Sequence, residues 1–307
     1  MKPFSQKSRK INDWFFGGTS DNWLATLRIG LGLELILYCI TSRADWHRMF
    51  ALQPGSFVTR DITEAIVTIG TALVPRMSWL ISAGQSVGLS EPGVLWIVWI
   101  ALLVAGSCLI AGLFCRSVAI VAWFFHLSAI KSSALLSYGV DNFTSIGLFY
   151  LVLSPLPDHL SLDRRWRKWS VKSARLHSFW RRVLQVHVCV IYFFSGITKL
   201  LGSGWWNGES LWRALTRPPF DIVPSAVLSY GKYLFIPLGL IICFLETSYP
   251  VFIWPRRTRA IWLGSIIGMH AAIAVMMGLY LFGLIMVVLN VAAFGADLVR
   301  LRSKKII

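Results

Sequence analysis

The sequence predicts an all-α integral membrane protein with about eight transmembrane helices. The composition is 56% hydrophobic and only 14% charged, with a mean hydropathy of +0.63, whereas a soluble domain carries about 25% charged residues. Several apolar runs are long enough to cross a hydrocarbon core of about 30 Å. The basic residues collect in short segments between these runs, as they do in multi-pass proteins.

The net charge of +16 does not indicate nucleic-acid binding, because no basic stripe interleaved with aromatic residues forms a soluble module. The five cysteines contain no C-x-x-C pair, so we interpret them as small buried hydrophobes and expect no metal site. The basic N-terminal stretch leads into the polar sequence INDWFFGGTSDN. We therefore expect no cleavable signal peptide, and the first span is predicted to act as the membrane address.

The apolar runs define eight predicted spans. They cover approximately residues 22–42, 93–114, 117–137, 142–156, 183–202, 233–254, 260–278 and 281–299. The fourth is short. Between the last two, the sequence around Gly278 allows either a tight turn or one long tilted helix.

The distribution of charge predicts the orientation in the membrane. If the N-terminus is cytoplasmic, most of the 30 lysine and arginine residues fall in cytoplasmic segments, in agreement with the positive-inside rule. We therefore predict that both termini are cytoplasmic and that the protein is integral to the cell membrane, the cytoplasmic (inner) membrane of a bacterium. The lipid bilayer is its expected partner.

The four longest segments outside the predicted spans are 1–21, 43–92, 157–182 and 203–232, of which 157–182 is predicted to be a basic, amphipathic cytoplasmic segment. Residues 1–21 form a cytoplasmic tail, and residues 43–92 and 203–232 are external. The sequence AIVTIGTALV in the first external segment is too short to span and is interpreted as a re-entrant or surface helix. Residues 157–182 mix tryptophan with arginine and lysine, which is typical of a helix on an anionic leaflet. No internal repeat is present, so residues 1–307 are predicted to form one membrane domain.

The stretch from Gln185 to Gly208 is the strongest candidate for a functional site. Gln185, Tyr192 and Lys199 are spaced seven apart, which is nearly two helical turns, so one polar face is predicted to point inward. A lysine within hydrocarbon is costly and usually functional. A desolvated lysine also loses its proton more easily and can act as a general base.

Other polar residues are predicted to lie at two depths. From the helical rise, Lys199 and Lys131 lie roughly 25 and 22 Å above the inner ends of their spans, where Asp141 and Asn142 begin the fourth span from outside. A second, inner layer is expected from the remaining intramembrane polar residues: Arg28, Glu34, His126, Glu246 and His270. Glu246 and His270, at roughly 12 and 15 Å, are predicted to couple two helices. That pair is as compatible with a structural tie as with catalysis, and Arg28 is equally compatible with snorkelling to the inner interface.

These residues together resemble the membrane domain of the vitamin-K-dependent gamma-carboxylase-like family, also called the horizontally transferred transmembrane (HTTM) domain. The carrying motifs are IYFFSGITKLLGSGWWNG, the LRIGLG sequence around Arg28, GVDNFTSIGLFYLVLSP, and GLYLFGLIM after His270. The compact bacterial branch, which includes the sporulation-delaying-peptide maturation protein B, is the most similar. Where the carboxylases have an Asn-His pair, this chain has Asp141-Asn142, so a family histidine is missing.

The resemblance implies a function that the residues alone do not. It implies catalysis by Lys199, with His270 and Glu246, acting on a reduced, vitamin-K-like quinone and a secreted peptide. It also implies substrate binding by a further set of residues: Tyr192, Trp205, Gly208, Asp141, Asn142, Lys131 and Arg28. The alternative, from another class, is a non-enzymatic factor for maturation or export of a secreted peptide toxin. A small-molecule transporter ranks last, because no inverted repeat is evident.

Overall fold

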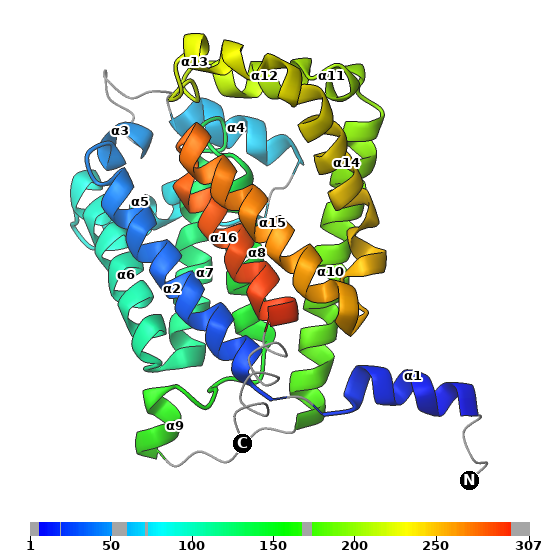
Figure 1. The fold of residues 1–307 in the computed structure, drawn as a ribbon. Helices are drawn as coiled ribbons and strands as arrows, with labels where there is room; N and C mark the ends of the chain where they lie inside the picture. Colours follow the sequence, from blue (N-terminus) through cyan, green and yellow to red (C-terminus); the bar gives the residue numbers. More distant parts are fainter. Residues whose placement is uncertain (1–5, 19, 51–59, 71–72, 168–173, 296–307) are drawn as a thin grey trace. The chain divides into compact units, whose positions relative to one another are not determined.

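The computed structural model describes residues 6–18, 20–50, 60–70, 73–167 and 174–295, and contains no β-strand among them (Figure 1). The prediction of an all-helical membrane protein is confirmed at this level. Five helices are long and apolar enough to cross a membrane, and two further apolar helices are shorter. The count of eight spans therefore stays a prediction, as does the orientation of the termini.

Each of the eight predicted spans nevertheless corresponds to a helix. The long apolar ones are α2 (Asn22–Ser42), α6 (Glu91–Ala111), α10 (Ala174–Leu200), α14 (Phe235–Phe252, preceded by the 3₁₀ turn η1 at Lys232–Leu234) and α15 (Arg256–Met277). The shorter ones are α8 (Gly139–Leu153) and α16 (Tyr280–Asn290), which continues into the π-helix η2 (Val291–Gly295). The eighth, α7 (Cys115–Ser132), is 18 residues long. Between α15 and α16 the chain makes a turn at Gly278, whose φ of 68° is left-handed, so the last two spans are separate helices.

The chain divides into two compact units, residues 1–23 with 173–307 (unit 1) and residues 24–172 (unit 2). Nothing tests the prediction of a single membrane domain.

Unit 2 is built from α2, α6, α7 and α8. Helix α6 begins at an N-cap serine, Ser90, and ends at Gly112 in the left-handed conformation, the favoured termini of a helix. A Cβ on Gly32 would lie 2.7 Å from the carbonyl oxygen of Gly106, and one on Gly106 would lie 2.9 Å from that of Gly32. The two glycines therefore let α2 and α6 pack backbone to backbone, as small residues do in membrane helix pairs.

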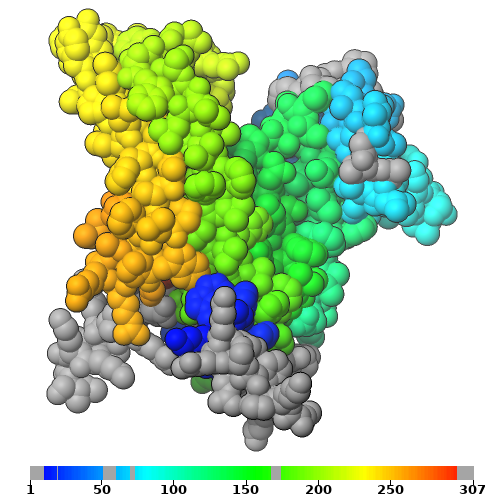
Figure 2. Space-filling view, turned by 90° about the vertical axis from the view of Figure 1, so that its right-hand side faces the viewer, coloured from blue at the N-terminus to red at the C-terminus, as the bar shows by residue number. Residues whose placement is uncertain are grey.

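The segment 43–92, which was predicted to be external, contains three helices among its described residues: α3 (Trp46–Phe50), α4 (Arg60–Gly70) and α5 (Met77–Ser86). Figure 2 shows residues 60–90 of this segment, in cyan, against the green helices of the same unit. Helix α4 packs on α7, and its outward residues Ile62, Ile66 and Ile69 are exposed. Within the part of AIVTIGTALV that the structure describes, this amphipathic helix fits the predicted surface helix; residues 71–72 lie outside the described part.

Unit 1 consists of α1 (Gln6–Phe16), α10, α14, α15, α16 and η2, with the short helices α11 (Ser203–Trp206), α12 (Glu209–Thr216) and α13 (Ser225–Tyr230) across one end (Figure 1). Helix α10 packs most extensively on α14, and α15 on α16. The N-terminal tail, predicted to be only a cytoplasmic extension, contains α1. This helix lies against α10, with Arg182 over the ring of Trp14.

The basic segment 157–182 is organised differently from the prediction. Residues Leu162–Arg167 form α9, and residues 168–173 lie outside the described part. From Ala174 onward the segment is continuous with the predicted span at 183–202, in one helix of 27 residues. The helix thus begins before the predicted span, because hydropathy changes near residue 183 while helix propensity does not: RLHSFWRRVLQV contains neither glycine nor proline.

Candidate functional site

The polar stripe predicted on α10 faces the interior of unit 1. Gln185 and Tyr192 are each 2% exposed and Gly196 is buried. At the N-terminal end of the stripe, the Gln185 amide donates to the carbonyl of Ala293 at 2.6 Å, and Arg181 Nε donates to the same carbonyl at 3.1 Å. That carbonyl belongs to the π-helix η2, where the irregular turn provides an acceptor for side chains.

Lys199 forms an ion pair at the C-terminal end of the stripe. Its ammonium lies 2.6 Å from Oε2 of Glu246 on α14, and it also donates to Ser195 Oγ at 2.6 Å. The side chains of Lys199 and Glu246 are 21% and 6% exposed, respectively. The ring of Trp205 covers the ammonium at 5.4 Å from the ring centroid, which adds a cation–π contact.

The prediction that Lys199 and Glu246 lie in different layers is wrong, because their charged groups are 2.6 Å apart. The depth argument also paired Glu246 with His270, whereas Glu246 pairs with Lys199 and His270 Nε2 bonds to Tyr192. Residue number measures depth only when helices stand normal to the membrane, and transmembrane helices tilt.

Gly196 explains why α10 and α14 meet at this level. A Cβ at Gly196 would lie 2.3 Å from Thr247 Oγ1 and 2.5 Å from the Thr247 backbone nitrogen. Only glycine permits this approach, which places Glu246, the neighbour of Thr247, within reach of Lys199. Pro250 lies four residues after Glu246 inside α14, so the Glu246 carbonyl has no helical N–H to accept from.

A second polar network lies beside this pair, one turn or more inward. The Asn290 amide donates to Tyr192 Oη at 2.7 Å and accepts from Tyr249 Oη at 2.7 Å. Because Tyr192 accepts from Asn290, its own proton is free to bond to His270 Nε2 at 2.8 Å. This assigns the His270 proton to Nδ1, an atom that is buried and has no partner.

Trp205 and Gly208, both predicted to bind substrate, lie in the turns that follow α10. Trp205 is half-buried. A Cβ on Gly239 of α14 would lie only 2.6 Å from the Trp205 carbonyl oxygen, so the glycine allows this close approach. Gly208 has φ +80°, and a Cβ there would meet the backbone of Phe235 and Ile236 at 3.0 Å. Gly208 therefore has a structural reason to be glycine, while Trp205 contacts the Lys199 ammonium directly.

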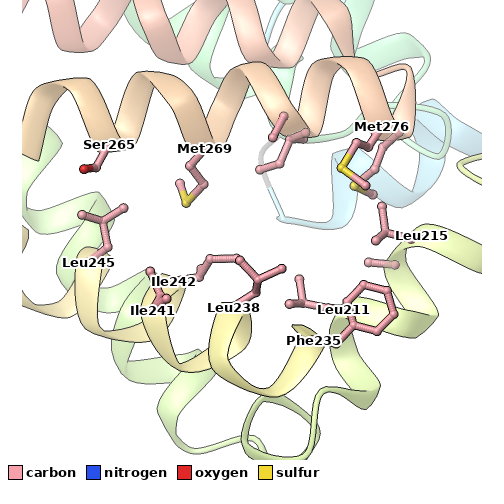
Figure 3. A pocket seen from close by; sticks show the side chains of 14 residues that line it. Leu211, Leu215, Phe235, Leu238, Ile241, Ile242, Leu245, Ser265, Met269 and Met276 are labelled. Carbon is pink, nitrogen blue, oxygen red and sulfur yellow. The ribbon is translucent and has the colours of Figure 1, made fainter. Parts of the chain in front are cut away.

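An apolar cavity of about 300 Å³ lies between α14 and α15 and is closed at one end by α12 (Figure 3). Its walls are almost entirely aliphatic; Ser265 is the one hydroxyl residue among those that line it. Leu245 and Met269 line the cavity, and each precedes a residue of the polar site, Glu246 and His270. The same two helices thus carry a hydrocarbon-lined space and the polar groups.

The other predicted site residues belong to unit 2. Arg28 is fully buried and its Nε lies 2.6 Å from Asp158 Oδ2. It also bonds to Asp158 Oδ1, to the carbonyl of Leu109 and, at 3.0 Å, to that of Ile110. Arg28 therefore caps the C-terminus of α6, whose last carbonyls lack helical donors. Its guanidinium group therefore neither extends to a membrane interface nor has donors pointing at a substrate site.

Asp141 and Asn142 start α8 but face different surroundings. Asp141 is buried and accepts from the Tyr138 backbone N–H at 2.9 Å, whereas Asn142 is exposed. Lys131 is half-buried and forms none of the ion pairs among the described residues. Burial, then the Asp141 carboxylate and then Glu34, raises the pKa of Tyr138 to about 12, so its hydroxyl stays neutral.

Three residues that bond to the predicted site residues were not themselves predicted from the sequence: Ser195, Asn290 and Asp158. Ser195 is four residues before Lys199, a spacing that puts it on the same face. Asn290 is a lone amide in the apolar run LIMVVLNVAAF, and such a residue signals a function or a helix contact. Asp158 gives no such signal, because it follows SPLP in a loop. Among the described residues, no group of three or more His, Cys, Asp or Glu is placed to hold a metal ion.

Comparison of the chain with protein-family models, with curated proteins and with solved structures gives no match.

Proposed function

We propose that this protein is a multi-pass membrane enzyme of the carboxylase-like HTTM type, in which Lys199 is the general base. The observation that carries the proposal is the 2.6 Å contact between the Lys199 ammonium and Glu246 within the apolar helices of unit 1. Eight spans with both termini in the cytoplasm, in a bacterial inner membrane, complete the proposed topology. This topology puts the Lys199 end of α10 on the external side.

Glu246 is positioned to accept a proton from the Lys199 ammonium. A lysine can act as a base only after it loses a proton, and a carboxylate in hydrogen-bond contact can take it. Ser195 orients the amine from the same helix.

His270 and Tyr192 supply a second proton position. The buried Nδ1 of His270, which has no protein partner, carries the donor hydrogen in the assigned tautomer. Tyr192 fixes the ring orientation from Nε2 at 2.8 Å, and Asn290 fixes Tyr192. In the proposed enzyme, Lys199 accepts a proton and His270 donates one, with Trp205 at the outer rim positioning the substrate.

The cavity between α14 and α15 fits the apolar tail of a quinone. Leu238, Ile242 and Met269 would hold such a tail (Figure 3). The cavity does not suit the quinol ring. The ring hydroxyls need hydrogen-bond partners, and Ser265 is the one hydroxyl residue among those that line the cavity. A reduced quinone bound beside Lys199 would offer a ring hydroxyl as the acid from which the amine takes a proton. The family resemblance then suggests a secreted peptide as the substrate.

A specific observation also favours the alternative, a non-enzymatic factor for maturation or export of a secreted peptide. The Lys199 ammonium already makes three interactions: hydrogen bonds to Ser195 and Glu246, and a cation–π contact with the ring of Trp205. A satisfied charge of this kind serves equally as a tie between α10 and α14. In that case Lys199 would need only its charge. A transporter remains the third candidate.

Three substitutions at Lys199 separate the two leading functions. Lys199→Arg keeps the charge, but a guanidinium stays protonated and cannot act as a base. We expect Lys199→Arg to give normal folded yield in detergent and to abolish the mass change in the secreted peptide, as Lys199→Ala does. Lys232→Arg, at an exposed lysine outside the network, is the control.

Full maturation with Lys199→Arg, combined with failure of Lys199→Ala and Lys199→Glu, would exclude the base role and support the assembly factor. Loss of folded protein in all three variants would make Lys199 structural and would not distinguish the two functions.

A further inference from the structure

Four buried polar side chains on helices α2, α7 and α8 of unit 2 carry polar atoms that have no hydrogen-bond partner. They are both carboxyl oxygens of Glu34, the hydroxyls of Tyr38 and Thr144, and Nδ1 of His126. Glu34 and His126 are each 1% exposed and Thr144 is 2% exposed. More than about 90% of buried polar groups in proteins are bonded, so four such groups on three packed helices require an explanation.

The four side chains belong to one cluster. A Cβ on Gly147 of α8 would lie 2.8 Å from Leu31 of α2. Helix α8 runs antiparallel to α2, so one turn from that contact brings Thr144 to the level of Glu34. Another turn brings Asp141 to the level of Tyr38. The ring of Tyr38 packs edge-on against His126 of α7, with ring centroids 5.5 Å apart.

No cation compensates the Glu34 carboxyl. Arg28, two turns below on the same helix, is committed to Asp158. The charged group that interacts with Glu34 is another acid, Asp141. Helix α7 contributes the imidazole of His126 and, nearer its end, Lys131, which forms none of the ion pairs among the described residues. Helix α6 contributes the buried, uncharged Leu102, Ala105 and Gly106.

An ionised Glu34 would therefore be an unpaired charge beside a second carboxylate. Burial of an isolated carboxylate costs far more than burial of a neutral acid, and in practice such a group is neutral. The unpartnered atoms are buried and not accessible to solvent. The cluster can therefore take up a proton, whereas a hydrated cation has no room beside the carboxyl.

We propose that unit 2 holds an intramembrane proton-binding site. The Glu34 carboxyl is the binding group, and Asp141 and the Tyr38–His126 pair are its exchange partners toward the outer end of α8. In each exchange the Glu34 side chain rotates into hydrogen-bond contact with its partner; the O–H bond of Glu34 then breaks and a new O–H bond forms on Asp141, or a new N–H bond forms at the unpartnered Nδ1 of His126. Transfer to neutral His126 produces a carboxylate and an imidazolium, so the net charge of the cluster does not change.

Infrared spectroscopy of the purified full-length protein tests this site directly. A protonated carboxyl has a carbonyl stretch that is resolved from that of a carboxylate. We expect this band at neutral pH in the wild type, its loss in Glu34→Gln, and its retention in Glu209→Gln, which changes an exposed acid. It should also remain in Lys199→Ala/Glu246→Gln, which removes the ion pair of the proposed enzyme site without leaving an unpaired buried acid, so the two proposals are tested separately. Asp141→Asn identifies any contribution from the second acid.

Thermal stability against pH gives the second readout. Because the native cluster holds the neutral acid, its stabilisation is present at acidic pH and lost as the carboxyl ionises with rising pH. Glu34→Gln should match the wild type in acid and exceed it in alkali. The proposal is overturned if the band persists in Glu34→Gln or disappears only in Asp141→Asn. It is also overturned if Glu34→Gln, a neutral isostere, fails to fold or is less stable than the wild type at neutral pH.

Discussion

The ion pair between Arg28 and Asp158 gives the sharpest stability prediction. Both side chains are fully buried and the closest N–O distance is 2.6 Å. Removing one partner of a buried pair leaves an uncompensated charge and costs about 3–5 kcal/mol. We therefore expect Arg28→Met and Asp158→Leu each to lower the free energy of unfolding by about that amount.

The double variant Arg28→Met/Asp158→Leu should lose much less than the two single variants together. It leaves no buried charge, and a hydrophobic replacement of a buried pair is often neutral. It still removes the donor to the carbonyls of Leu109 and Ile110, and unsatisfied buried acceptors cost about 1–3 kcal/mol. The double variant should thus lie about 1–3 kcal/mol below the wild type, a strongly non-additive result.

The assay is equilibrium unfolding in mixed detergent micelles, with folded protein followed by tryptophan fluorescence. The control is the pair Arg213–Glu209, which has the same 2.6 Å distance but side chains 74% and 48% exposed. Arg213→Met should cost less than about 1 kcal/mol, because exposed pairs contribute little. Equal losses in the two pairs, or strict additivity of the Arg28 and Asp158 variants, would refute the role assigned to this pair.

Three further predictions concern unit 1 and the topology. Gly196→Ala should destabilise by about 1–3 kcal/mol, since its Cβ would overlap Thr247, whereas Gly264→Ala, with open space around it, should be neutral or stabilising in the same unfolding assay. Tyr192→Phe removes the hydroxyl that bonds both His270 and Asn290; it should cost about 1–3 kcal/mol, and no loss would contradict that network. A cysteine at position 303 should resist a membrane-impermeant thiol reagent in intact cells, while one at Ser229 should react; labelling at 303 would contradict a cytoplasmic C-terminus.

The sequence predicts helices well because hydropathy and turn residues mark them independently. The span predicted at residues 22–42 coincides with α2, and Gly112 and Gly278 mark two helix ends as left-handed glycines. The start of α10 was not predictable in this way, since an amphipathic basic helix runs directly into an apolar one without a breaker. Five helices meet the length and hydropathy required for a span, so the remaining three need a topology experiment.

The candidate site was only partly predictable, because spacing along one helix fixes a face but not its partner. The heptad of Gln185, Tyr192 and Lys199 correctly gave an inward stripe. The partners came from other helices, and their level depends on where glycines allow close approach, as at Gly196. The depth argument ignored that, and it therefore paired Glu246 with the wrong residue. Asp158 was missed because a loop acid has no periodicity.

A charge swap between Lys199 and Glu246 tests the central claim most directly. The double variant Lys199→Glu/Glu246→Lys keeps an ion pair between α10 and α14 but moves the amine to the other helix, away from Ser195 and the outer rim. We predict that folded yield recovers relative to either single variant, while the mass of the secreted peptide remains that of the unmodified form. Recovery of both folding and peptide maturation would contradict an acid–base role for Lys199 and leave only a structural tie.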